Sequence, residues 1–388
     1  MQQDIVFTIF LIFTGAAVLA TIALYARQAL LVAYIVLGVL LGPSVFGLVN
    51  DSDLIGDIAH IGIMFLLFLM GLELDPKEFV LLMRKTTVVT LLSSFVFWGT
   101  GAILAALFGY SFLETVLIGA AMIFSSTIIG LKLLPTTVLH HQRTGEIIIS
   151  ILLMQDFIAI VLLLILEGSA EQDSSFLAFF KLALALPLLI AASALFVNKV
   201  LLRLLRAFDT FHEYIFLLAI GWCLGMAEGA AALGISHEIG AFVGGVTLAS
   251  SPISQYMSIH LKPLRDFFLV MFFFSLGASF DLGMLGNILL PAFIFAAITI
   301  VGKPPIFKIL LKHNGEPKER AAEVGVRLGQ LSEFSLLIAV LALERGLIGT
   351  EASYLIQLAT LLTFFATTYF VVLRYPTPIA LSDHLRRD

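Results

Sequence analysis

Residues 147–166 read IIISILLMQDFIAIVLLLIL, an apolar segment that contains one amide, Gln155, and one charge, Asp156. The nearest other charged residues, Glu146 and Glu167, flank the segment. A helix of about 20 apolar residues is long enough to cross a bilayer. A charge near the bilayer centre costs about 2.5–3.5 kcal/mol even on insertion scales. Asp156 is therefore predicted to lie on an ion or proton pathway, and a structural hydrogen bond between helices is the alternative.

The composition extends this interpretation to the whole chain. The 388 residues are 60% apolar and 13% charged, with a mean hydropathy of +1.05, which excludes an ordinary soluble domain. Residues 5–24 follow no basic segment and are predicted to be the first span rather than a cleavable signal peptide. The single cysteine, Cys223, cannot form an intrachain disulfide. We predict an all-α polytopic membrane protein that forms a single transmembrane domain over residues 1–388.

Apolar runs predict about thirteen transmembrane helices, the length of each matching a bilayer of roughly 30 Å. The predicted spans are 5–24, 30–48, 54–74, 86–108, 112–134, 146–166, 176–198, 213–233, 238–250, 264–280, 284–311, 322–344 and 352–373. Because basic residues mark cytoplasmic loops, their distribution tests this count independently.

Basic residues concentrate in every second loop and at the C-terminus. They are Arg27; Lys77, Arg84, Lys85; Lys132, Arg143; Lys199, Arg203, Arg206; Lys262, Arg265; Lys308, Lys312, Lys318, Arg320, Arg327; and Arg374, Arg386, Arg387. Apart from Lys303, only Lys181 and Arg345 lie elsewhere. This alternation predicts an inner (cytoplasmic) membrane protein with its N-terminus outside and its C-terminus in the cytoplasm.

Two predicted spans carry polar interruptions. The fifth contains Phe124-Ser125-Ser126-Thr127, and the twelfth contains Gly329-Gln330-Leu331-Ser332-Glu333-Phe334. The odd offset between the fifth and twelfth spans reverses their orientation in the membrane. This pattern is typical of an inverted repeat whose two broken helices cross near the midplane.

A carboxylate can carry either a proton or a cation when burial brings its pKa close to the working pH. Asp156 fits this requirement, and Gln155 adds a carbonyl oxygen suited to a hard monovalent cation. We predict that Asp156, Gln155 and Thr127 bind the cation. Ser125, Ser126 and Thr127 are expected to line the site, or alternatively to bond only to helix carbonyls.

Lys303 is a second charge enclosed by apolar sequence. Gly302 before it and Pro304-Pro305 after it are expected to weaken the helix, since proline removes an amide donor. The ammonium could pair with Asp156, titrate, or cap exposed carbonyls. Glu333 is expected either to stabilise the second interruption or to lie on the cytoplasmic approach to the site.

Other polar or small residues are given structural roles. Glu73, in Gly71-Leu72-Glu73-Leu74-Asp75-Pro76, lies at a helix end and is expected to be architectural. Gly240, Gly244 and Gly245 predict close packing between helices.

The chain resembles the cation:proton antiporter-2 family, especially its Kef-type potassium/proton branch, over nearly its full length. The motifs are Gly71 to Pro76, Phe124 to Thr127, Gln155-Asp156, Gly302-Lys303-Pro304, and Gly329-Gln330 with Ser332-Glu333-Phe334. The resemblance implies a Nha-type inverted-repeat fold with two crossed broken helices. It implies core helices at about 86–166 and 284–373, beside dimerisation helices at about 5–74 and 176–280. It also implies elevator-like movement, with Asp156 as ion and proton carrier and Lys303 near it.

Two features separate the chain from parts of that family. Gln155-Asp156 is similar to the potassium branch, whereas Gly302-Lys303-Pro304 is also similar to sodium-transporting relatives, so both cations stay open. The predicted loop at 255–262 lacks the acidic residues of glutathione-gated relatives, and the last span ends near residue 373. We therefore expect no cytoplasmic nucleotide-binding domain, and leave open a separate regulatory subunit or a truncated chain.

The leading hypothesis is a secondary antiporter that exchanges K+ or Na+ for H+, not an enzyme. Such an antiporter would need no cofactor beyond the transported ions. We expect it to contact membrane lipid, to form a homodimer and to bind no nucleic acid. A sodium-coupled solute symporter would usually need more than one sodium site. A channel has less need of a titratable Asp at the midplane, and a sensor would normally carry an output domain.

Overall fold

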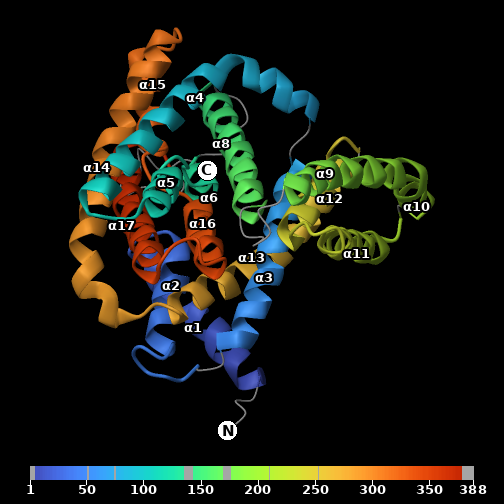
Figure 1. Cartoon of the computed structure of the whole chain (residues 1–388), viewed down its shortest axis with the longest axis horizontal. Helices are drawn as coiled ribbons and strands as arrows, with labels where there is room; N and C mark the ends of the chain where they lie inside the picture. Colours follow the sequence, from blue (N-terminus) through green and yellow to red (C-terminus); the bar gives the residue numbers. More distant parts are fainter. Residues whose placement is uncertain are drawn as a thin grey trace. The chain divides into compact units, whose positions relative to one another are not determined.

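A computed structural model describes residues 5–49, 52–73, 76–134, 143–168, 176–208, 210–251 and 253–377. The basic residues Arg386 and Arg387 and the acidic residues Asp51, Asp75, Glu171 and Asp173 lie outside these ranges, as does part of the loop after Lys132. In the described part of the chain the fold is built from helices (Figure 1).

The helix bounds follow the apolar runs of the sequence, and polar or glycine-containing segments separate them. They are α1 (Ile5–Tyr25), α2 (Leu30–Leu41), α3 (Ser52–Glu73), α4 (Pro76–Leu107), α5 (Phe112–Ala121), α6 (Thr127–Lys132), α8 (Arg143–Gly168), α9 (Phe176–Phe196), the π-helical turn η1 (Val197–Leu201), α10 (Leu202–Ala207), α11 (His212–Ala231), α12 (His237–Ala249), α13 (Ser254–Ala278), the 3₁₀ turn η2 (Leu282–Met284), α14 (Leu285–His313), α15 (Lys318–Arg327), α16 (Glu333–Glu344) and α17 (Thr350–Arg374). Among the described helices, seven are long and apolar enough to span a membrane.

The helices form two compact units. The first comprises Met1–Ala17, Tyr34–Val80 and Leu164–Ser279, and in it α3 packs against both α12 and α13. The second comprises Val18–Ala33, Leu81–Leu163 and Phe280–Asp388. In the second unit α14 packs against α15 and α17, and α16 packs against α17 and α5 (Figure 1). Both polar interruptions therefore belong to the second unit.

The two interruptions coincide with gaps between consecutive helices. α5 ends at Ala121 and α6 begins at Thr127, while α15 ends at Arg327 and α16 begins at Glu333. We refer to residues 122–126 as the first break and residues 328–332 as the second break. Each break exposes backbone groups that a continuous helix would satisfy, so other groups must pair with them.

Some helix boundaries differ from those expected. Residues 255–262, expected to be a loop, belong to α13, which begins at Ser254 and continues through Pro263. Hydropathy locates only the apolar part of a helix, so it misses polar turns that extend beyond the bilayer. The helix around Lys303 was expected to be weakened, but α14 runs without interruption through Pro304 and Pro305. A proline removes a single backbone donor, and packed neighbours in transmembrane helices can compensate for it.

Glycines allow α3 and α12 to approach closely, as the sequence predicted for Gly245. A Cβ atom added to Gly245 would lie 2.0 Å from the Phe68 carbonyl oxygen. A Cβ atom added to Gly71, on the facing helix, would lie 2.4 Å from the Phe242 carbonyl oxygen. Because backbone occupies these positions on both sides, even one methyl group would separate the helices.

Gly245→Ala should therefore destabilise the protein by about 1–3 kcal/mol, the usual cost of overpacking. Thermal unfolding of the detergent-purified protein would measure this as a lower melting temperature. Gly221→Ala is the matched control, because no atom lies within 4 Å of a Cβ atom at that helical position. The control should be neutral or slightly stabilising. Equal melting temperatures for Gly245→Ala and the wild type would contradict the close-packing account.

Candidate functional site

Gln155, on α8, holds the first break through both ends of its side-chain amide. Its Oε1 accepts a hydrogen bond from the Ser125 backbone N–H at 3.0 Å. Its Nε2 donates to the Ile123 carbonyl oxygen at 3.2 Å. Gln155 is fully buried. Its amide therefore provides the hydrogen bonds that water would otherwise give to the backbone of the first break. The predicted cation ligand thus also supports the backbone of the break.

Lys303, on α14, lies between the ends of two helices. Its Nζ donates to the Phe124 carbonyl oxygen at 2.7 Å and to the Gln330 carbonyl oxygen at 3.2 Å. The Ile123 carbonyl oxygen and Ser125 Oγ each lie at 3.4 Å. The ammonium also lies 5.0 Å from the centroid of the Phe97 ring. Of the three roles considered for Lys303, the structure displays the capping of exposed carbonyls.

The two breaks are joined by serine hydroxyls. Ser125 Oγ donates to the Leu328 carbonyl oxygen at 2.9 Å, which follows the end of α15. Ser335 Oγ, on α16, donates to the Ala121 carbonyl oxygen at 2.6 Å, at the end of α5. The first break thus bonds to the carbonyl that follows α15, and the first turn of α16 bonds to the carbonyl at the end of α5.

Serines also begin the helices that follow the breaks. The Oγ of Ser126 accepts from the Ile129 N–H at 3.1 Å, and the Oγ of Ser332 accepts from the Phe334 N–H at 3.2 Å. Both are N-cap interactions, which satisfy donors that the helix itself leaves free. Ser125 Oγ therefore bonds to a backbone carbonyl and lies near the Lys303 ammonium, and Ser126 Oγ accepts from a backbone N–H. That these serines line an ion site stays a prediction.

Thr127 and Glu333 meet at the starts of α6 and α16. Thr127 Oγ1 donates to Glu333 Oε1 at 2.8 Å, and the Glu333 side chain is buried. A carboxylate is favoured at helix N-termini and an ammonium at helix C-termini, because of the partial charges there. Glu333 accordingly lies at the N-terminal ends of α6 and α16, and Lys303 lies at the C-terminal ends of α5 and α15. The site is therefore built to balance the charge of four half-helix ends.

Asp156 follows Gln155 on α8 and is only 3% exposed. Leu152 lies one helical turn before it, on the same face of α8. A Cβ atom added to Gly130 of α6 would lie 3.4 Å from Leu152 Cδ1, so this face of α8 turns towards α6. The four oxygens around the Lys303 ammonium do not include those of Asp156. A pair between Lys303 and Asp156 stays a prediction from the sequence.

Two polar side chains near the breaks were not predicted to form the contacts that they make. Thr363 Oγ1, on α17, accepts from the Leu331 N–H of the second break at 3.0 Å. Arg327, counted above as a loop charge, is 1% exposed and donates to the Leu133 and Pro376 carbonyl oxygens. The only available signal was the position of Arg327 immediately before a break, which a charge count by loops overlooks.

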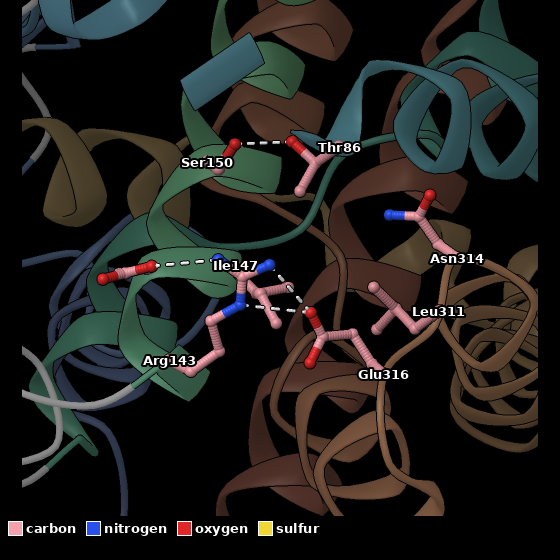
Figure 2. A pocket seen from close by; sticks show the side chains of 8 residues that line it. Thr86, Arg143, Ile147, Ser150, Leu311, Asn314 and Glu316 are labelled. Atoms are coloured by element: carbon pink, nitrogen blue, oxygen red, sulfur yellow. Dashed lines mark hydrogen bonds and ion pairs between the residues drawn. The ribbon is translucent and has the colours of Figure 1, made fainter. Parts of the chain in front are cut away.

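A polar pocket lies at the start of α8, one end of the helix that carries Asp156 (Figure 2). Arg143 points across it to Glu316, with Nη2 3.0 Å from Oε1, and Arg320 pairs with the same carboxylate at 2.8 Å. Deeper along α8, the hydroxyls of Ser150 and Thr86 are hydrogen-bonded. The ion pairs tie the start of α8 to the segment between α14 and α15.

The charge state of Glu316 follows from these contacts. Burial alone would raise the pKa of its carboxyl group, but hydrogen bonds and ion pairs with Arg320 and Arg143 lower the pKa below its ordinary value. Glu316 therefore stays ionised at neutral pH, where its pairs with Arg143 and Arg320 are both charged.

Comparison with known proteins identifies the class of this architecture. A family model described as "Sodium/hydrogen exchanger, transmembrane" matches residues 9–374. The chain belongs to the sodium/hydrogen exchanger family. Membership in this family makes the chain a multi-pass membrane transporter.

Individual proteins share sequence or fold with the chain. Iron transporter MagA from Paramagnetospirillum magneticum is 27% identical, and the match covers 93% of this chain and 84% of MagA. The glutathione-regulated potassium-efflux system protein KefC of Salmonella schwarzengrund is 29% identical over 94% of this chain. The chain spans 59% of the length of that KefC. These matches confirm the Kef-type resemblance drawn from the motifs.

A solved structure supports the fold. The sodium proton antiporter MjNhaP1 from Methanocaldococcus jannaschii superposes with a TM-score of 0.73, covering 98% of this chain and 97% of that chain. Its sequence identity to the chain is 16%, so the likeness concerns the fold alone. The expected Nha-type architecture is confirmed at this level.

Proposed function

We propose that the protein is a secondary active antiporter that exchanges a monovalent cation, K+ in preference to Na+, for protons. The observation that carries the proposal is the buried Asp156 on α8, next to a Gln155 amide that bonds to the first break. A buried carboxylate can hold a proton or a cation but not both, which is the requirement for coupled exchange. Asp156 is the carrier, and Gln155 and Thr127 contribute oxygen atoms near it.

Alternating access would be of the elevator type. The chain would cross the membrane about thirteen times, with α5–α6 and α15–α16 as the two broken helices that cross near the midplane. Helices at about 86–166 and 284–373 would form the moving core, and those at about 5–74 and 176–280 the dimerisation domain. The division of the chain into two compact units supports this assignment, except that Val18–Ala33 groups with the core segments. Inner-membrane insertion with an external N-terminus follows from the basic loops.

Sodium/proton exchange at the same site is the alternative. Gly302-Lys303-Pro304 supports it by resemblance, whereas Gln155-Asp156 and the similarity to KefC favour potassium. A solute symporter or a channel fits less well, since one buried Asp beside two broken helices suits exchange at one carboxylate. A homodimer and a separate regulatory subunit are both proposed by the same resemblance.

Potassium should be transported at least as well as sodium. A neutral Gln155 amide in place of a second carboxylate lowers the field strength of the site. A weaker field reduces the advantage of the smaller, more strongly hydrated cation. Purified protein in liposomes that contain a pH-sensitive dye should show proton movement on addition of K+, Rb+ or Na+ in turn. Exchange with sodium alone would contradict the potassium assignment and leave the alternative.

A further inference from the structure

Gln330, in the second break, has a buried oxygen atom without a hydrogen-bond partner. Its side chain is fully buried. Its Nε2 lies 3.4 Å from the Ser126 carbonyl oxygen, to which it donates. Among the described residues no group donates to its Oε1. Exchanging the two ends of the amide would place two oxygens against each other, so the contact with Ser126 fixes the orientation of the amide.

The second feature is the position of this amide relative to Asp156. The Cβ position of Gly130 lies 3.4 Å from Leu152 Cδ1 and 4.0 Å from Gln330 Nε2. Leu152 and Asp156 share one face of α8, because they are four residues apart. The face of α8 that carries Leu152 and Asp156 is directed towards Gly130 of α6. The Gln330 amide lies beside the same residue of α6, and therefore on the same side as Asp156.

The third feature is the use of the other oxygens in the site. Gln155 Oε1 already accepts a hydrogen bond from the Ser125 N–H. The backbone carbonyl oxygens of Phe124 and Gln330 accept hydrogen bonds from Lys303. Thr127 Oγ1 donates its hydrogen to Glu333. The free Oε1 of Gln330 is a hard, neutral oxygen of the kind that suits an alkali cation. A buried carbonyl oxygen with no partner is unfavourable by itself, which indicates an occupant.

We infer that Gln330 Oε1 is a ligand of the transported cation and helps to set its affinity. This inference rests on the proposed antiport function and adds to it a residue outside the Gln155-Asp156 pair. When the cation is bound at Asp156, Gln330 supplies a neutral oxygen from the second break. Both breaks then contribute to one site, the first through the Gln155 amide that bonds to it and the second through Gln330.

The test compares three variants in two measurements. Gln330→Met keeps the length of the side chain but removes the oxygen. Gln330→Glu keeps an oxygen at the position but removes the donor to Ser126. Gln357→Met makes the same change as Gln330→Met at another buried glutamine, on α17, whose Nε2 donates to Ser353 Oγ of its own helix. The measurements are the K+ concentration at half-maximal proton exchange in liposomes, and the rise in melting temperature with K+ at constant ionic strength.

Gln330→Met should raise the half-saturating K+ concentration about tenfold, the effect of losing one contact of hydrogen-bond strength. The rise in melting temperature should move to higher K+ by the same factor. Gln330→Glu should bind K+ at least as tightly as the wild type, and Gln357→Met should keep the wild-type half-saturation.

Three results would overturn the inference. One is an unchanged half-saturation in Gln330→Met, which would assign the oxygen to a bound water molecule. Another is an equal increase in Gln357→Met, which would make the effect a general one of losing a buried amide and would decide the matter even if Gln330→Glu did not fold. A wild type with neither exchange nor a K+-dependent melting temperature would overturn the proposed function as well, so the two failures can be told apart.

Discussion

Asp156→Asn should insert and fold normally, yet exchange cations for protons no faster than protein-free liposomes. An asparagine amide is close in shape to the carboxylate but cannot alternate between a bound proton and a bound cation. The Asp156 side chain is buried on α8 and only 3% exposed. A group on the water-exposed surface therefore cannot take over its role as carrier. Dye-reported proton movement after addition of K+ or Na+ measures the loss, and size-exclusion chromatography in detergent checks the fold.

Asp266→Asn is the matched control for this substitution. Asp266, on α13, is a surface carboxylate with a side chain 53% exposed and paired with Arg265. Such exposed pairs contribute about 1 kcal/mol or less, so the control should keep the exchange rate of the wild type. Near wild-type exchange by Asp156→Asn would remove Asp156 from its role as carrier.

Lys303→Met should cause the largest loss of stability among changes at the site. The Lys303 ammonium donates to carbonyl oxygens at both breaks, and an apolar side chain would leave them without a donor. Each buried carbonyl left unsatisfied costs about 1–3 kcal/mol. We expect a clearly lower melting temperature and no measurable exchange. A melting temperature equal to that of the wild type would show that Lys303 does not stabilise the breaks.

Lys303→Gln should restore part of both properties, because its amide can donate two hydrogen bonds to these carbonyls. If Lys303 stays a structural counter-charge, exchange through Asp156 is one for one and electroneutral, and this variant keeps measurable exchange with a shifted pH optimum. Currents on a solid-supported membrane report net charge movement directly. Currents in the wild type that vanish in Lys303→Gln, while dye-reported exchange persists, would show that Lys303 carries a second proton.

Much of the fold could be predicted because membrane constraints appear directly in the sequence. Apolar runs and basic loops indicated a polytopic helical protein, and Ser125 and Ser332 marked the two places where helices end and begin again. Helix ends were harder to predict. α13 begins at Ser254, because helical hydrogen bonding continues into polar sequence that hydropathy does not register.

The site was predicted in its residue types but not in its contacts. Gln155 and Lys303 stood out as polar residues in apolar segments, yet sequence could not tell whether Lys303 would contact Asp156 or carbonyl oxygens. That choice depends on how α14 packs against the two breaks, which no local pattern encodes. The contact of Thr363 with the second break also depends on packing between helices. It was missed because a threonine in a transmembrane helix usually bonds to its own helix.

The most direct test of cation/proton exchange at Asp156 is whether a cation gradient drives protons uphill. Wild-type liposomes with the same pH on both sides and a tenfold K+ gradient, without an ionophore, should develop a pH difference approaching one unit, since tenfold in either ion is about 1.4 kcal/mol. Asp156→Asn liposomes in the same gradient should develop none. A wild type that develops no pH difference with K+ or with Na+, or an Asp156→Asn variant that matches the wild type, would contradict the account.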